Sequence, residues 1–227
     1  SECLVGSEMC IRDRAISAKG GTNAENHNHN DVGSYAVALG SETMVGDQGG
    51  PNSYPGDYFN GDAPQKYKIK GSFGHPVPVV DGRTQSSGGK AKGVVLQKEF
   101  TNEKDVFSID YTSAYSTPNL DKLIRTFVYD RQGKGNFTVG DEFTAKTPIR
   151  FETAITTRAD WKVLDDTHLL LATDSEQMIV AIDASGKVAF TSETIEVNSP
   201  AYTRIGIALK NQSKDCLLYT SPSPRDT

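Results

Sequence analysis

The stretch Ser34–Asp47, with the sequence SYAVALGSETMVGD, carries the clearest signal of the fold in this chain of 227 residues. Two short runs, Ser34–Leu39 and Glu42–Asp47, flank the pair Gly40-Ser41. Large apolar residues alternate with alanine through the first run, as in a strand with one more deeply buried face. A glycine-containing pair between two such runs is typical of a two-residue β-hairpin. We therefore expect an antiparallel hairpin here.

Similar short runs, rich in Val, Ile and Thr, follow along most of the chain, and no stretch keeps a 3.6-residue period over ten or more positions. Asp183–Gly186 (DASG) predicts a tight hairpin between two of these runs. A dozen short strands at this spacing indicate an all-β fold of stacked antiparallel β-sheets, a β-sandwich. The further expected strands are Lys92–Phe100, Asp105–Ala114, Leu123–Asp130, Asn136–Val139, Ile149–Ile155, Trp161–Leu164, Leu169–Thr173, Met178–Ile182, Val188–Glu193 and Arg204–Leu209.

The two ends of the chain look like translated sequencing adapter. Cys216–Asp226 (CLLYTSPSPRD) can be back-translated so that its reverse complement encodes Cys3–Asp13 (CLVGSEMCIRD) residue for residue. Two unrelated peptides should not encode each other on opposite strands. We therefore interpret residues 1–14 and 216–227 as adapter-derived and residues 15–215 as one natural β-sheet domain whose gene continues beyond both ends.

This interpretation changes what composition implies. All three cysteines, Cys3, Cys10 and Cys216, lie in the adapter-like ends, so they give no information about disulfides or thiolate ligands. The ends hold three basic and four acidic residues, which leaves a net charge of −4 from the total of −5. A mildly acidic domain argues against nucleic-acid binding, which needs a basic surface. No apolar run reaches the roughly 18 residues that a membrane-spanning helix needs.

Residues 48–80 differ from the rest of the chain. They are rich in Gly, Pro, Asn, Asp and Tyr, and a connection of this length in a compact domain is usually functional or disordered. Their aromatic residues argue against disorder. Lys66, Lys68 and Lys70 alternate along this segment, and they suit either a surface facing an anionic glycan or a solvated edge.

Three of the four histidines fall in or beside this segment. Asn26-His27-Asn28-His29 leads into the first expected strand, and His75 lies near the far end of the long segment. In an extended chain residues two apart share a face, so we expect His27 and His29 to project together. With Asp47, at the end of the partner strand, two imidazoles and a carboxylate suit three ligands of a zinc-type site. A hydrogen-bonded loop without metal is the alternative.

The run from Gly20 to Gly50 (GGTNAENHNHNDVGSYAVALGSETMVGDQGG), the tyrosines that follow it and SFGHPVPVVDGRTQ resemble the C-terminal domain of heparinase II/III-like polysaccharide lyases, a family that includes oligoalginate lyases. RTFVYDRQGKGNFTVGDEF also resembles a strand–turn–strand of that domain. The similarity spans roughly Lys19 to Leu209. It implies β-elimination of uronate-containing polysaccharides, such as alginate or glycosaminoglycans, in a cleft between this domain and an N-terminal (α/α) toroid.

By position, the resemblance assigns roles to residues of this chain. His29, Asp47 and His75 match the family's metal ligands, for which zinc is the expected ion. His27 matches a histidine at the cleft, and either Tyr58 or Tyr54 matches the tyrosine that the family presents to the uronate. These three residues are the candidates for proton transfer or substrate contact. The expected polar contacts to sugar are Asn26 and Gln85. The metal can stabilise charge as a Lewis acid or fix the loop, and the separation of its ligands along the chain favours the second role.

The resemblance also defines what this chain lacks. The toroid normally supplies further catalytic residues, so we expect residues 15–215 alone to have no lyase activity and the toroid of the same chain to be their partner. The family and the size of an acidic polysaccharide substrate imply a periplasmic, envelope or secreted bacterial protein.

Two other functions remain open. One is a non-catalytic carbohydrate-binding β-sandwich. The other is a cupin-like metal enzyme, against which the hairpin order and the absence of a suitable glutamate after His29 count.

Overall fold

The structure, a computed structural model, describes residues 3–5, 14–46, 49–133, 135–195 and 201–224. Within these residues strands dominate, and every strand pair is antiparallel. The strands form three stacked sheets and one two-stranded ribbon, so the predicted all-β fold is confirmed. None of the helices in the described part of the chain has the length and apolar character needed to cross a membrane.

The first sheet contains the predicted hairpin. Val37, Ala38 and Leu39 face Val45, Thr43 and Glu42 across the turn at Gly40-Ser41, although the second strand ends at Val45. The strand order in this sheet is β1 (Cys3–Val5), β2 (Arg14–Lys19), β4 (Tyr35–Leu39) and β5 (Glu42–Val45).

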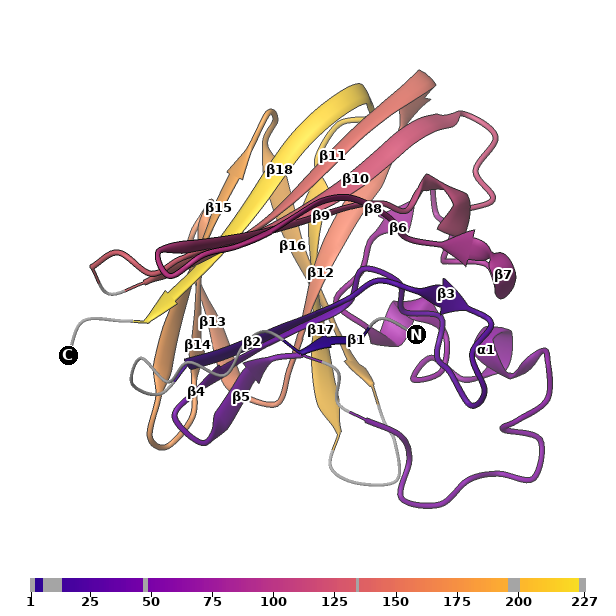
Figure 1. The fold of residues 1–227 in the computed structure, drawn as a ribbon, viewed down its shortest axis with the longest axis horizontal. Coiled ribbons are helices and arrows are strands. Elements are labelled where there is room, and N and C mark those ends of the chain that lie inside the picture. The colour runs from indigo at the N-terminus through magenta and orange to yellow at the C-terminus, as the bar shows by residue number, and fades with distance from the viewer. Residues whose placement is uncertain (1–2, 6–13, 47–48, 134, 196–200, 225–227) are drawn as a thin grey trace.

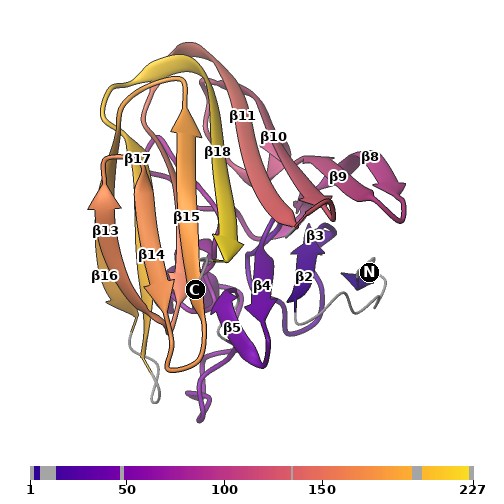
Figure 2. The same cartoon turned by 90° about the vertical axis from the view of Figure 1, so that its left-hand side faces the viewer.

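The second and largest sheet has eight strands, several of which lie side by side in Figure 2. Asp105–Ala114 was expected to be one strand, but the strand ends at Asp110 and residues 112–114 form a 3-10 turn, η2 (Thr112–Ala114). The order is β13 (Asp160–Asp165), β14 (His168–Ala172), β15 (Gln177–Ala184), β18 (Ser213–Pro224), β11 (Asn136–Ile149), β10 (Leu120–Asp130), β9 (Lys104–Asp110) and β8 (Val94–Phe100).

The third sheet lies behind the second in Figure 1. Its order is β16 (Val188–Ile195), β17 (Tyr202–Leu209), β12 (Phe151–Thr157) and β6 (Val79–Val80). The predicted hairpin at Asp183–Gly186 is wrong, because β15 and β16 belong to different sheets and this turn carries the chain from one to the other. A turn signal fixes the reversal of the chain but does not determine strand pairing.

One hydrophobic core runs through the stack. Tyr35 of the first sheet packs on Phe127 and Phe137 of the second, with ring centroids 5.9 and 6.0 Å apart. Phe143 of the second sheet lies 4.8 Å from Phe151 of the third. Strands such as β4 and β10 bury alternate residues in this core, as the period of two predicts, whereas the edge strand β8 is exposed along its whole length.

The strand β18 occupies the centre of the largest sheet, although residues from 216 onward belong to the segment interpreted as adapter. It pairs with β11 from Ile149↔Ser213 to Val139↔Thr220 and with β15 from Ala184↔Leu218 to Met178↔Pro224. Cys216 and Leu218 are buried in the core. In this structure β11 and β15 are thus joined into one sheet through residues 213–224.

The segment that differs in composition folds beside the sheets at one end of the stack (Figure 1). It contains a single helical turn, α1 (Ala63–Lys66), and a 3-10 turn, η1 (Ser72–Gly74). Near it lies the ribbon of β3 (Thr22–Asn23) and β7 (Gly88–Lys92). The histidine run, by which we mean residues 26–29, follows β3 and therefore meets the long segment at this end.

Candidate functional site

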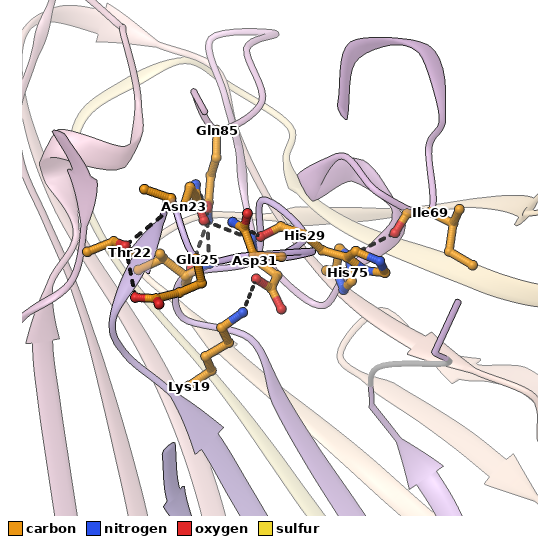
Figure 3. Close-up of polar contacts among 12 residues, drawn as sticks. Lys19, Thr22, Asn23, Glu25, His29, Asp31, Ile69, His75 and Gln85 are labelled. Carbon is orange, nitrogen blue, oxygen red and sulfur yellow. Dashed lines mark hydrogen bonds and ion pairs between the residues drawn. The ribbon is translucent and has the colours of Figure 1, made fainter. Parts of the chain in front are cut away.

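Two predicted ligands, His29 and His75, meet in space. His29 Nδ1 lies 3.2 Å from His75 Nε2, and their ring centroids are 5.1 Å apart. His75 is buried and its Nε2 also lies 3.0 Å from the carbonyl oxygen of Ile69, as Figure 3 shows. Segments 46 residues apart in the sequence thus bring two imidazoles together in a tilted arrangement, nitrogen to nitrogen.

The third predicted ligand, Asp47, lies outside the described residues. Among the residues that the structure does describe, no group of three or more His, Cys, Asp or Glu side chains converges as a metal site. The separation of the His29 and His75 nitrogens nevertheless suits zinc. Two nitrogens bound at about 2.0–2.1 Å in tetrahedral geometry lie roughly 3.3 Å apart. The same 3.2 Å separation also suits a hydrogen bond between neutral rings.

Tyr58 is the tyrosine that reaches the histidine pair. Its hydroxyl lies 3.2 Å from His29 Nε2, the nitrogen that faces away from His75. A partner on the second ring nitrogen fixes the orientation and tautomer of an imidazole, which is a common arrangement around metal-binding histidines. Tyr54, by contrast, is 54% exposed and packs its ring 5.1 Å from that of Tyr58.

His27 does not project with His29 as expected. Residues 24–27 form a turn, with Asn28 N donating to Glu25 O, and His27 has the left-handed backbone angle φ 59°. The expected two-residue alternation fails because it holds only for extended chain. His27 instead lies exposed, with its ring 4.7 Å from that of Phe59, and Asn26 is exposed in the same turn.

Gln85 has a different environment from the one expected. It is buried, its Oε1 accepts from Asn23 Nδ2 and Val32 N, and its Nε2 donates to Val32 O. Figure 3 shows this amide beside Asn23. A sugar contact through the amide would require these segments to separate, so the structure gives Gln85 the role of joining them.

The lysines of the long segment also separate into two kinds. Lys66 pairs with Asp57 and Lys68 with Glu193, both on the exposed surface. Hydrogen bonds from Lys66 and Tyr67 lower the pKa of Asp57 below its usual value. Lys70 is buried, donates to the carbonyl oxygen of Tyr58, and burial lowers the pKa of its ammonium group.

An open groove borders the site. It has a volume of about 500 Å³. Residues of the long segment form one wall and β16 the other. The groove is lined by Pro51, Pro55, Tyr58, Lys66, Tyr67, Lys68, Ile69, Glu193, Thr194 and Ile195.

Sequence reasoning missed the residue that anchors both histidine segments, Arg125 of β10. This side chain is completely buried, and its Nη1 donates to Gly33 O and Pro76 O, both at 2.7 Å. Gly33 follows His29 by four residues and Pro76 is next to His75. The Arg125 guanidinium therefore ties both segments to the large sheet.

Asp141 of β11 completes this anchor. It lies directly across from Arg125 in the strand register and receives Arg125 Nε and Nη2 at 2.8 and 2.7 Å. Tyr111 and Thr153 hydroxyls donate to the same carboxylate, each at 2.8 Å. A buried ion pair is tolerated when its remaining hydrogen-bonding groups are satisfied in this way.

Gly33 allows the backbone after the histidines to lie close to the Arg125 guanidinium and the Tyr111 ring. Its backbone adopts φ 85°, a conformation that side chains rarely permit, and a Cβ there would lie 3.3 Å from the Tyr111 ring. The signal that could have revealed the anchor is the placement of Arg125 and Asp141 at inward positions of two strands that alternate with apolar residues.

Comparisons with known proteins agree on the fold. The sequence matches no protein-family model and no curated protein sequence. Among solved structures, it is similar to heparinase III, with a TM-score of 0.73, 17% identity and coverage of 93% of this chain and 33% of that chain. A second heparinase III is similar with a TM-score of 0.74 and 12% identity, and the match covers 93% of this chain and 33% of that chain. A heparan sulfate lyase from Pedobacter heparinus is similar with a TM-score of 0.73 and 13% identity, and the match covers 94% of this chain and 34% of that chain.

These likenesses show the fold. The chain spans about a third of the length of the lyases that it matches, as expected for one β-sheet domain of such an enzyme. The resemblance to heparinase II/III-like lyases is thus confirmed for the architecture.

Proposed function

We propose that this chain is the β-sheet domain of a polysaccharide lyase that cleaves uronate-containing glycans by β-elimination. The observation that carries the proposal is the meeting of His29, His75 and Tyr58 at one end of a fold shared with heparinase III and heparan sulfate lyase. A pair of histidines with a tyrosine hydroxyl bonded to one of them, on a fold of this kind, suits a site for acid–base chemistry on a glycan.

The reaction places clear demands on the site. A base removes the proton next to the uronate carboxylate, the C4–O bond breaks, a C4–C5 double bond forms, and the leaving oxygen takes a proton. Imidazole and phenol groups can accept and donate these protons. His27 and Tyr54 are exposed and accessible to a polymer, whereas Tyr58 is buried against His29. We assign proton transfer to His27 and Tyr54, and to Tyr58 the orientation of the His29 ring.

We further propose that His29 and His75, with Asp47, hold a zinc ion. When bound, zinc supplies a fixed positive charge and a cross-link between chain segments that bury little apolar surface of their own. The 3.2 Å separation of the facing ring nitrogens supports this assignment, and so does the second-nitrogen contact from His29 to Tyr58.

Metal content of the purified chain tests the zinc assignment. We expect about one zinc per chain, lost in His29→Ala and in His75→Ala. His168→Ala is the matched control, because His168 is a half-exposed histidine at the start of β14 whose ring contacts its neighbours Asp165 and Thr167. Zinc that persists in both variants, or that is lost in the control, would contradict the ligand set.

The lyase proposal needs the longer protein. We expect no unsaturated uronate product from this chain alone, and product once residues 15–215 are rejoined to the upstream part of their gene. His27→Ala and Tyr54→Phe should then lower the rate without unfolding the domain. Glycan binding by the full protein with no product from any uronate polysaccharide would favour the carbohydrate-binding module instead. The periplasm, the envelope or the medium is the proposed location, because the polymer substrate lies outside the cell.

A further inference from the structure

Three aromatic side chains lie together on the surface above the histidine pair. Phe59 is half exposed, and its ring centroid lies 4.7 Å from that of His27 and 5.2 Å from that of Tyr54. His27 and Tyr54 are themselves exposed. We call these three residues the aromatic platform. Exposed rings in contact with one another offer an apolar surface on which the C–H face of a sugar can stack.

A buried cation lies against the central ring of the platform. Lys70 Nζ is 5.0 Å from the centroid of Phe59 and 4.8 Å from that of Tyr58. Its side chain is 6% exposed, and among the described residues no carboxylate lies within ion-pair distance of it. The neighbouring lysines differ, because Lys66 and Lys68 are already paired. Among the described residues of this segment, Lys70 is thus the lysine without a carboxylate partner.

The combination has a specific electrostatic effect. The face of an aromatic ring is negative, and it packs well against the C–H face of a sugar but repels a carboxylate. An ammonium group close to the ring offsets that negative potential. Because the ammonium group is buried among low-dielectric side chains, its field is screened less than that of a surface lysine. A platform with such a cation suits an acidic sugar.

Polar groups flank the rings. Asn26 precedes His27 and Asn60 follows Phe59, and both are exposed. Their amides can donate to and accept from sugar hydroxyls. The surface therefore combines stacking, a positive field and amide hydrogen bonds, which are the features needed to bind a uronate residue.

We infer that the aromatic platform of His27, Tyr54 and Phe59, with Lys70 beneath it, is a sugar-binding subsite that selects uronates over neutral sugars. This inference deepens the proposed function and rests on it for the class of ligand. Phe59 stacks on the sugar ring, and Lys70 supplies the preference for a carboxylate.

Binding of two matched probes tests the subsite. The first is an unsulfated tetrasaccharide containing glucuronate, and the second is the same tetrasaccharide with its carboxylates reduced to alcohols. Dissociation constants come from NMR titration of the whole chain. We expect the wild-type chain to bind the acidic probe roughly tenfold more tightly than the reduced one, which corresponds to a difference of about 1.4 kcal/mol.

Two variants separate the roles of ring and charge. Lys70→Met should weaken binding of the acidic probe about tenfold, so that its affinity equals that of the reduced probe. The affinity for the reduced probe should not change. Phe59→Leu should weaken both probes by a similar factor. The matched controls are Lys68→Met, a lysine paired with Glu193, and Phe100→Leu, an exposed phenylalanine on the edge strand β8. Neither control should change binding, and circular dichroism should be the same for all variants.

The outcomes are decisive for the subsite. Equal affinity for both probes, no effect of Lys70→Met, or no binding of either probe would overturn it. Failure here is distinguishable from failure of the proposed lyase, because zinc content and product formation by the longer protein do not require Phe59. Conversely, charge-selective binding without product would leave the subsite in place and remove the lyase.

Discussion

Two buried cations, Arg125 and Lys70, hold the same histidine run but are bonded in very different ways. The Arg125 guanidinium has Asp141 as counter-ion and also donates to two carbonyl groups and a hydroxyl. The Lys70 ammonium donates to one carbonyl oxygen and lies beside two aromatic rings. The Lys70 main-chain oxygen accepts from Asn30 N, which follows His29. Both residues thus hold backbone close to His29, Arg125 through its side chain at Gly33 and Lys70 through its main chain at Asn30.

The difference separates a structural charge from an available one. A guanidinium whose donors are satisfied by the chain contributes order and has nothing left to offer a ligand. An ammonium group without a counter-ion keeps a field that an anion can satisfy, at a cost in folding free energy. Stability should therefore depend strongly on Arg125, and ligand selectivity on Lys70.

The largest effect is expected for Arg125→Met. This change leaves the Asp141 carboxylate buried without its cation, and removing one partner of a buried pair costs about 3–5 kcal/mol. Urea unfolding followed by circular dichroism measures the loss. The matched control is Arg131→Met, which breaks a bidentate pair with Asp105 near the surface and should cost about 1 kcal/mol. Equal losses in the two variants would show that Arg125 is not a special anchor.

A smaller effect is expected for Tyr58→Phe. The change removes one hydroxyl that bonds to His29 Nε2 and keeps the ring, so the chain should lose about 1 kcal/mol of stability. The readout that a purely structural role would not move is zinc affinity, which should fall because the His29 ring is less well oriented. Tyr67→Phe, which removes a hydroxyl bonded to Asp57, is the control and should leave zinc affinity unchanged.

The smallest effect is expected for Lys70→Met, and its sign should depend on pH. Burial lowers the pKa of Lys70 below its ordinary 10.5. Between the lowered folded pKa and 10.5 the unfolded chain binds more protons, so stability due to this group rises with pH in that window. The wild-type chain should therefore gain stability relative to Lys70→Met as the pH is raised from 7 to 10. Urea midpoints of both proteins at each pH measure the difference, and a constant difference would contradict a desolvated ammonium group.

The sequence predicted the strands better than their pairing. Alternation of apolar residues located the hairpin around Gly40-Ser41 and most other strands, because a half-buried strand must alternate. It could not show that β15 and β16 belong to different sheets, since a tight turn is compatible with both a hairpin and a crossing between sheets. Partner choice depends on the whole stack rather than on the turn.

The site shows the same division. Histidine spacing and the family resemblance brought His29 and His75 together, and the structure places them 3.2 Å apart. The turn at residues 24–27 separates His27 from His29, which spacing in an extended chain did not predict. The burial of Lys70 depends on the rings of Tyr58 and Phe59, which the alternation of lysines along the segment could not show. Arg125 and Asp141 were accessible to sequence reasoning as two inward charges on alternating strands, but only their register shows that they pair.

The position of β18 has a consequence for aggregation. The strands β13–β15 and β8–β11 belong to one sheet only because β18 lies between them. If this strand detaches, β11 and β15 each expose an edge of unpaired backbone N–H and C=O groups, which is a template for a foreign strand. Loss of a single strand from the middle of the sheet therefore opens two edges at once, and association through them is the expected way for this fold to fail.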